Sequence, residues 1–85
     1  MSTPQEATME TVKPLSEWSK SVIATSAQCY ISRRELAYES GMSNSYLSRV
    51  LFNKVPTWDR SKEKIEAGLK TCVEKRGIRF EDVFP

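Results

Sequence analysis

Five side chains that can hydrogen-bond to a partner lie within one short window of the chain, and none of them is acidic. They are Ser43, Asn44, Ser45, Ser48 and Arg49. Asparagine matches the neighbouring donor and acceptor of adenine, and arginine matches the two acceptors of guanine, whereas serine can contact any base. These residue types therefore predict hydrogen-bonded recognition of base edges rather than the making or breaking of bonds.

The residues that enzymes and metal sites require are missing or scattered. The chain has no histidine, and its three glycines, Gly41, Gly68 and Gly77, are too far apart to form a phosphate-binding loop. Cys29 and Cys72 lack the spacing of metal ligands, and we expect both to fill the core. We therefore predict no catalytic residues, no metal site, no cofactor and no small-molecule ligand, and we expect that the protein is not an enzyme.

Signals for two short helices and a turn surround this polar window. Ser32 and Glu35 have the spacing of a capping box at the start of a first helix, which Gly41 would end. Ser43 is a favourable N-cap for a second helix over residues 44–52. The apolar positions of that helix recur at helical spacing: Leu47, Val50 and Leu51. The polar residues consequently fall on its opposite face.

This pattern resembles the helix-turn-helix of the lambda-repressor and Cro-like DNA-binding family. The residues that carry the likeness are Leu36-Ala37, Gly41-Met42-Ser43 and Leu47-Ser48-Arg49-Val50. Ala37 precedes Gly41 by four residues, where the family has a small side chain, and Leu47 follows it by six, where the family has a buried aliphatic residue. Ser40 departs from the family, which usually has an apolar residue at that position.

The resemblance implies that the second helix enters the major groove of double-stranded DNA as a recognition helix. Ser43, Asn44, Ser45, Ser48 and Arg49 would then contact bases. A second set of residues would contact phosphates: Ser32, Arg33, Arg34, Tyr46, Asn53 and Lys54. The chain also resembles the short repressors of plasmids and phages, which implies a homodimer on a palindromic operator. A helical protein-interaction module or antitoxin without specific DNA binding remains the alternative.

The flanking sequence predicts an all-α fold, a compact domain of four to five helices over residues 14–77. Residues 1–13 are polar and are expected to form a tail, with a DNA-embracing arm as the alternative that their acidic charge disfavours. A helix from residues 14–16 to about residue 28 would bury the apolar positions Leu15, Trp18, Val22 and Cys29.

A longer helix is expected after Pro56, with Thr57 as its N-cap and Gly77 just beyond its end. Gly68 leaves open whether this helix is continuous or broken. Its expected buried stripe consists of Trp58, Ser61, Ile65, Leu69, Cys72 and Val73.

Residues 78–85 carry more apolar surface than a solvated tail would normally hold. The apolar side chains are Ile78, Phe80, Val83 and Phe84. The sequence predicts that this segment is a dimer contact, and the alternative is that it completes the core of the monomer.

Charge is distributed unevenly along the chain, whose formal net charge is +2. Residues 32–56 contain four basic and two acidic residues, whereas residues 1–31 contain two and three and residues 57–85 contain seven and six. The predicted helix-turn-helix is therefore the most basic part, as expected for a DNA-binding element. No signal peptide and no apolar run of about 20 residues is present, which predicts a cytoplasmic protein without a membrane partner.

Overall fold

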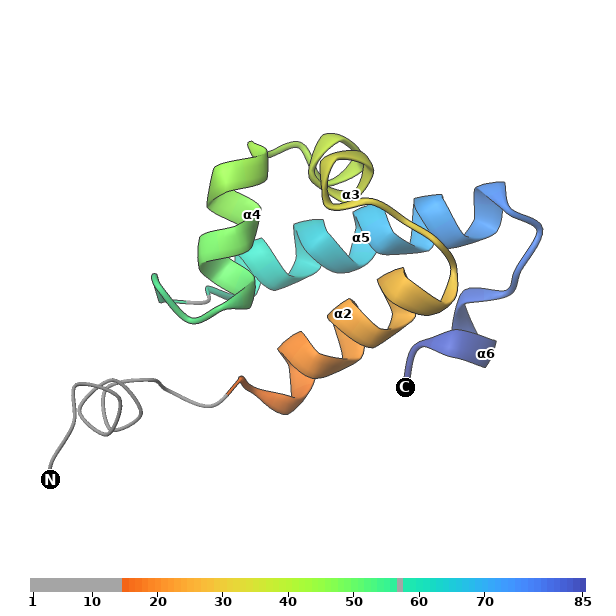
Figure 1. Ribbon diagram of the computed structural model, residues 1–85, viewed down its shortest axis with the longest axis horizontal. Helices are drawn as coiled ribbons and strands as arrows, with labels where there is room; N and C mark the ends of the chain where they lie inside the picture. Colours follow the sequence, from red (N-terminus) through yellow and green to blue (C-terminus); the bar gives the residue numbers. More distant parts are fainter. Residues whose placement is uncertain (1–14, 57) are drawn as a thin grey trace, which may run out of the picture.

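The computed structural model describes residues 15–56 and 58–85, and in these ranges the chain forms five helices and no strand (Figure 1). The helices are α2 (Glu17–Gln28), α3 (Arg33–Ser40), α4 (Asn44–Leu51), α5 (Asp59–Lys75) and α6 (Phe80–Val83). The predicted all-α fold of four to five helices is thereby confirmed. The predicted tail, residues 1–13, lies outside the described residues.

Serine side chains start three of the helices, because each hydroxyl accepts a bond from a backbone amide that the helix leaves unpaired. The Oγ atoms of Ser16, Ser32 and Ser43 each lie 3.0 Å from the amide nitrogen three residues later. Gly41 ends α3 with φ of 71°, a left-handed conformation that suits glycine. The two predicted short helices thus form with the expected caps and stop.

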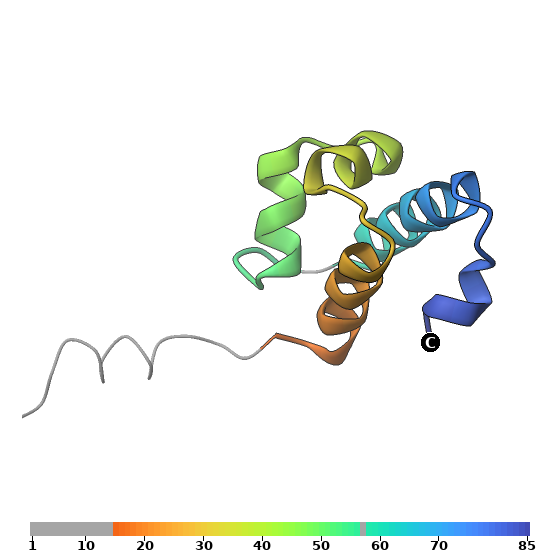
Figure 2. The same cartoon turned by 45° about the vertical axis from the view of Figure 1, so that its right-hand side comes forward.

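Helices α2, α3 and α6 pack on α5, and α4 packs on α3 (Figures 1 and 2). Helices α2 and α3 lie on different sides of α5, and α4 runs across its N-terminal end. The predicted stripe of α5 is buried at Ser61, Ile65, Leu69, Cys72 and Val73. The remaining core side chains are Val22, Cys29, Ile31, Leu36, Ala37, Leu47, Val50 and Leu51.

Trp58 was expected in this stripe, and that prediction is wrong, because 63% of the residue is exposed. Trp58 is the N-cap of α5 and has an extended backbone, with φ of −79° and ψ of 152°. Trp58 therefore precedes the first helical residue, and its side chain does not follow the helical spacing that buries the rest of the stripe. The predicted N-cap, Thr57, lies outside the described residues.

Gly68 does not interrupt α5, which is continuous over 17 residues. It lies at a close approach of α3 and α5: a Cβ atom on Gly68 would be 2.7 Å from the amide nitrogen of Ser40. Ser40 is only 5% exposed at this crossing. Ser40 occupies a position where an apolar residue was expected from the resemblance. Its small size fits this crossing, because a small residue on each helix lets the two backbones approach closely.

The C-terminal segment folds back onto its own domain. Ile78, Phe80, Val83 and Phe84 are all partly buried against the core cluster. Thr25 Oγ1 of α2 donates a hydrogen bond of 2.9 Å to the carbonyl oxygen of Val83. The segment therefore packs on the core of its own chain, as the alternative prediction stated, while each of its four apolar side chains keeps some exposed surface.

Trp18 on α2 is partly buried, and its indole is held in place by two contacts with α5. The ring nitrogen donates a hydrogen bond of 2.7 Å to Glu66. The amine of Lys62 lies 5.6 Å from the ring centroid, within the range of a cation–π contact. The sequence correctly placed Trp18 on the inward side of α2, and its polar nitrogen explains why it remains at the edge of the core.

Candidate nucleic-acid interface

Helix α4 separates its side chains into an apolar and a polar face. Leu47, Val50 and Leu51 are fully buried. Asn44, Ser45 and Arg49 are exposed on the other side. Figure 1 shows α4 at one end of the molecule with its outer side uncovered by the other helices. Three of the five predicted base-contacting residues therefore share one accessible face.

The other two predicted base-contacting residues, Ser43 and Ser48, border this face with their oxygen atoms already engaged. Ser43 Oγ accepts the 3.0 Å capping bond from the amide of Tyr46. Ser48 Oγ accepts a 3.3 Å hydrogen bond from the guanidinium of Arg33. Both serines still carry a hydroxyl hydrogen that can be donated to a ligand.

Arg33 was predicted to contact phosphate, but the structure directs its side chain to α4. Besides its bond to Ser48, its guanidinium carbon lies 5.4 Å from the ring centroid of Phe52. This arrangement joins the first turn of α3 to the last turn of α4. Arg33 is half-buried, whereas its neighbour Arg34 is exposed. Arg34 is thus the more accessible of the two arginines.

The remaining predicted phosphate contacts lie at the start of α3, within α4 and just after α4. Ser32 caps α3, and Tyr46 is half-buried. Asn53 has φ of 60° and is half-buried just after α4. The amide of Lys54 donates a 2.7 Å bond to the carbonyl of Arg49, and the Lys54 side chain is exposed. Arg34 at the start of α3 and Lys54 just after α4 therefore offer two exposed cationic groups.

Both acidic residues of α3 are paired with basic residues at the end of α5. Glu35 forms a two-bond ion pair with Arg76, with N–O distances of 2.7 and 3.0 Å. Glu39 pairs with Lys75. Among residues 15–56 and 58–85, no carboxylate forms an ion pair with Arg34, Arg49 or Lys54. The acidic charges of the helix pair are thus compensated away from the exposed face of α4.

The predicted capping box of Ser32 and Glu35 forms only in part. Ser32 caps the amide of Glu35 as expected, but the Glu35 carboxylate pairs with Arg76. The two residues are 41 positions apart in the chain, so short-range spacing could not reveal the pair. The hydrogen bond from Arg76 lowers the pKa of Glu35, outweighing the opposing effect of desolvation.

This pKa shift predicts a defined pH dependence of stability. Because the folded-state pKa of Glu35 lies below its ordinary value of 4.5, ionised Glu35 stabilises the fold above pH 4.5. That contribution is lost as the pH falls through the lowered folded-state pKa. We expect Glu35→Gln to melt at a lower temperature than the parent protein at pH 7, and the two melting temperatures to converge in acid. Thermal melts recorded over a range of pH measure the difference in melting temperature, and Glu63→Gln on the exposed side of α5 is the control. A difference between Glu35→Gln and the parent protein that stays constant at all pH values would contradict the prediction.

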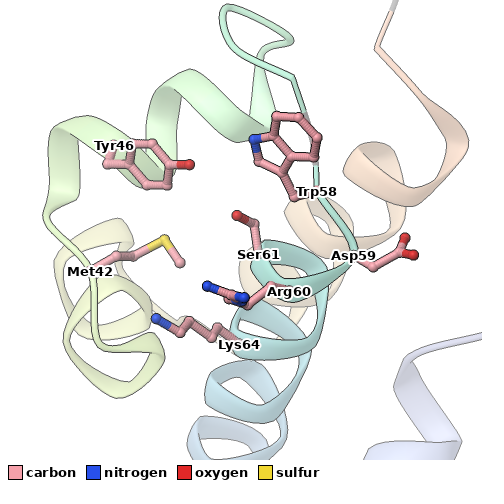
Figure 3. Close-up of a pocket in the computed structure, with 7 residues that line it drawn as sticks. All are labelled: Met42, Tyr46, Trp58, Asp59, Arg60, Ser61 and Lys64. Atoms are coloured by element: carbon pink, nitrogen blue, oxygen red, sulfur yellow. The ribbon is translucent and has the colours of Figure 1, made fainter.

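A cleft of about 620 Å³ adjoins α4 on the side of Tyr46 (Figure 3). Met42 and Tyr46 form one wall, and the other wall comes from the start of α5 with Trp58, Arg60 and Lys64. Figure 3 shows the charged ends of Arg60 and Lys64 extending toward Met42. The sequence analysis missed these two cations, because only the fold brings the start of α5 beside α4.

No protein-family model matches the chain, and no characterised protein or solved structure matches it significantly. Within the described ranges, no group of three or more His, Cys, Asp or Glu side chains is arranged to hold a metal ion. None of the helices in the described part of the chain is long and apolar enough to cross a membrane. The geometry of the residues themselves therefore carries the functional argument.

Proposed function

We propose that the protein is a cytoplasmic, sequence-specific repressor that binds double-stranded operator DNA with α4 in the major groove. The observation that carries this proposal is the exposed, carboxylate-free face formed by Asn44, Ser45 and Arg49. Such short donors and acceptors can reach base edges. The resemblance to short plasmid and phage repressors supports the same function.

The cations around α4 would supply affinity for DNA, whereas the polar face of α4 would supply sequence specificity. Arg34 at the start of α3 and Lys54 just after α4 are exposed and are available to contact phosphates, which position a protein on the duplex without reading its sequence. Arg60 and Lys64 add two cations at the cleft beside Tyr46, which Asp59 also lines. Base contacts from α4 would then distinguish one sequence from another.

The test of this proposal is the salt dependence of binding to labelled duplexes. Each lost phosphate contact should reduce the slope of log affinity against log salt by about one unit between about 50 and 200 mM salt. We expect this change for Arg34→Gln and for Lys54→Gln, and no change for Lys70→Gln, an exposed lysine of α5 that serves as the control. Equal slopes for all three variants, or no measurable duplex binding by the parent protein, would contradict the proposal.

The repressor is proposed to act as a homodimer, because one recognition helix covers few base pairs and specificity usually comes from two half-sites. The C-terminal segment and α2 border a groove of about 720 Å³ lined by Trp18, Phe80 and Phe84. The partly exposed apolar side chains here are the proposed dimer contact. Sedimentation of the intact chain at micromolar concentration should give twice 9.7 kDa; a species that stays monomeric even on operator DNA would contradict it.

The same groove also favours a second candidate, a helical module or antitoxin that binds another protein. Its rim carries Glu17, Glu66 and Glu81 around the apolar floor. This candidate predicts that substitutions around the groove abolish binding of the partner protein, whereas Arg49→Ala leaves that binding unchanged. The DNA-binding proposal predicts that Arg49→Ala loses sequence-specific DNA binding.

A further inference from the structure

Trp58 occupies a position that helix capping and core packing do not explain. It is the N-cap of α5, where small polar residues are preferred, and its side chain makes no capping bond. It does not fill the core either, since 63% of the residue is exposed. The indole instead lines the cleft beside Tyr46 (Figure 3). An aromatic ring in the wall of a cleft is suited to packing against a planar ligand.

Two cations from the start of α5 line the same cleft. Arg60 and Lys64 lie about one helical turn apart, and among the described residues neither forms an ion pair with a carboxylate. Asp59 also lines the cleft, but Figure 3 shows its carboxylate directed away from these two cations. Both positive charges are therefore accessible to an anion that enters the cleft.

Ser61 adds a polar group that has no partner in the fold. Only 8% of the residue is exposed, and within the described part of the chain its hydroxyl forms no hydrogen bond. Most buried polar groups are hydrogen-bonded, because burial removes their bonds to water. Figure 3 shows the Ser61 hydroxyl directed into the cleft, toward Tyr46 and Trp58. The hydroxyl lies in the first turn of α5, where the unpaired amides of a helix attract negative charge.

We propose that this cleft binds a small aromatic carboxylate. The carboxylate accepts a hydrogen bond from Ser61 and pairs with Arg60 and Lys64. The aromatic ring packs between Trp58 and Tyr46. The cleft volume of about 620 Å³ is within the range of small-molecule sites. This site goes beyond the proposed function, and it departs from the sequence-based expectation that the protein has no small-molecule ligand.

An NMR titration of the intact chain with naphthylacetate tests the proposal. Two matched probes separate the parts of the ligand: naphthylacetamide keeps the ring without the charge, and acetate keeps the charge without the ring. We expect naphthylacetate to shift the indole resonance of Trp58 and the amides of Arg60 and Ser61. It should bind about tenfold more tightly than either matched probe. The indole of Trp18, which is hydrogen-bonded to Glu66, should not shift.

Substitutions assign each part of the ligand to its contacts. Arg60→Gln and Lys64→Gln should each weaken the binding of naphthylacetate severalfold and leave the binding of naphthylacetamide unchanged. Trp58→Ala should weaken the binding of both ring-containing probes. Lys70→Gln, on the exposed side of α5, removes the same charge and should bind all probes as the parent protein does. Circular dichroism of each variant establishes that a change in binding does not come from unfolding.

Three results would overturn the proposal. Acetate or inorganic phosphate that binds as tightly as naphthylacetate would show that the cleft accepts a bare anion, such as a DNA phosphate. Shifts confined to the Trp18 indole would place the ligand elsewhere. The absence of a saturable shift at millimolar naphthylacetate would show that no such site exists. The proposed function is unaffected by these results, because the salt dependence of duplex binding tests it separately.

Discussion

Replacing Arg49 by alanine is expected to lower the preference for operator over random duplex by about 5- to 150-fold. The loss of one bidentate contact to a base costs about 1–3 kcal/mol of discrimination, and about 1.4 kcal/mol corresponds to a factor of ten. Arg49 is exposed on α4 and forms no ion pair within the described residues, so its removal should leave the helix folded. Competition binding of selected against random duplex measures the ratio.

The matched control is Arg79→Ala, which removes an equal charge at the N-cap of α6, where Arg79 lies 3.9 Å from Glu81. Figure 1 shows α4 and α6 at opposite ends of the molecule. Both variants lose one positive charge, so both can weaken nonspecific binding slightly. Only Arg49→Ala should change the ratio of specific to nonspecific affinity. An unchanged ratio would mean that α4 does not read bases with this face.

Gly68→Ala is expected to destabilise the fold by roughly 2 kcal/mol, which corresponds to a drop in Tm of about 10 °C for a domain of this size. In an isolated helix the same change would be stabilising by about 1 kcal/mol, because alanine is the better helix former. Here the added Cβ would lie 2.3 Å from Ser40 Oγ, 2.7 Å from Ser40 N and 2.9 Å from the carbonyl carbon of Glu39. The sign of the change in stability therefore reports whether α3 and α5 meet at this point.

A second variant separates side-chain from backbone contacts. Gly68→Ala combined with Ser40→Ala removes the hydroxyl oxygen but leaves the two backbone atoms in place, so recovery should be incomplete. Ala67→Gly, at the exposed neighbouring position, should cost only about 1 kcal/mol through helix propensity. Chemical denaturation of all three proteins gives the free energies of unfolding. A more stable Gly68→Ala protein would show that the two helices do not cross as described.

Features that depend on a few neighbouring residues were predictable from the sequence. The caps at Ser32 and Ser43 and the left-handed stop at Gly41 each involve atoms within about one helical turn. The apolar stripes of α4 and α5 follow directly from helical spacing, apart from Trp58 at the start of α5. These local signals were sufficient to predict an all-α domain and to place Asn44, Ser45 and Arg49 on one exposed face.

Features that depend on helix packing were not predictable in this way. The pairing of Glu35 with Arg76 and the contact between Ser40 and Gly68 both join α3 to α5 across a long stretch of chain. Arg33 was expected to face phosphate because its charge is visible in the sequence, whereas its contacts with Ser48 and Phe52 require the turn between α3 and α4. The sequence therefore shows which residues are cations, but only the fold shows where their charged groups lie.

The most direct test of the central claim, that α4 and the start of α3 form a DNA-binding face, is an NMR titration of the intact chain. The probe is a random-sequence duplex of about 20 base pairs at low salt, because nonspecific and specific binding are expected to use the same basic surface. We expect amide shifts in α4, in the first turn of α3 around Arg34 and near Lys54, with α2 and the C-terminal segment unchanged. Shifts confined to the groove around Trp18 and Phe84, or an unaltered spectrum at saturating duplex, would contradict the account.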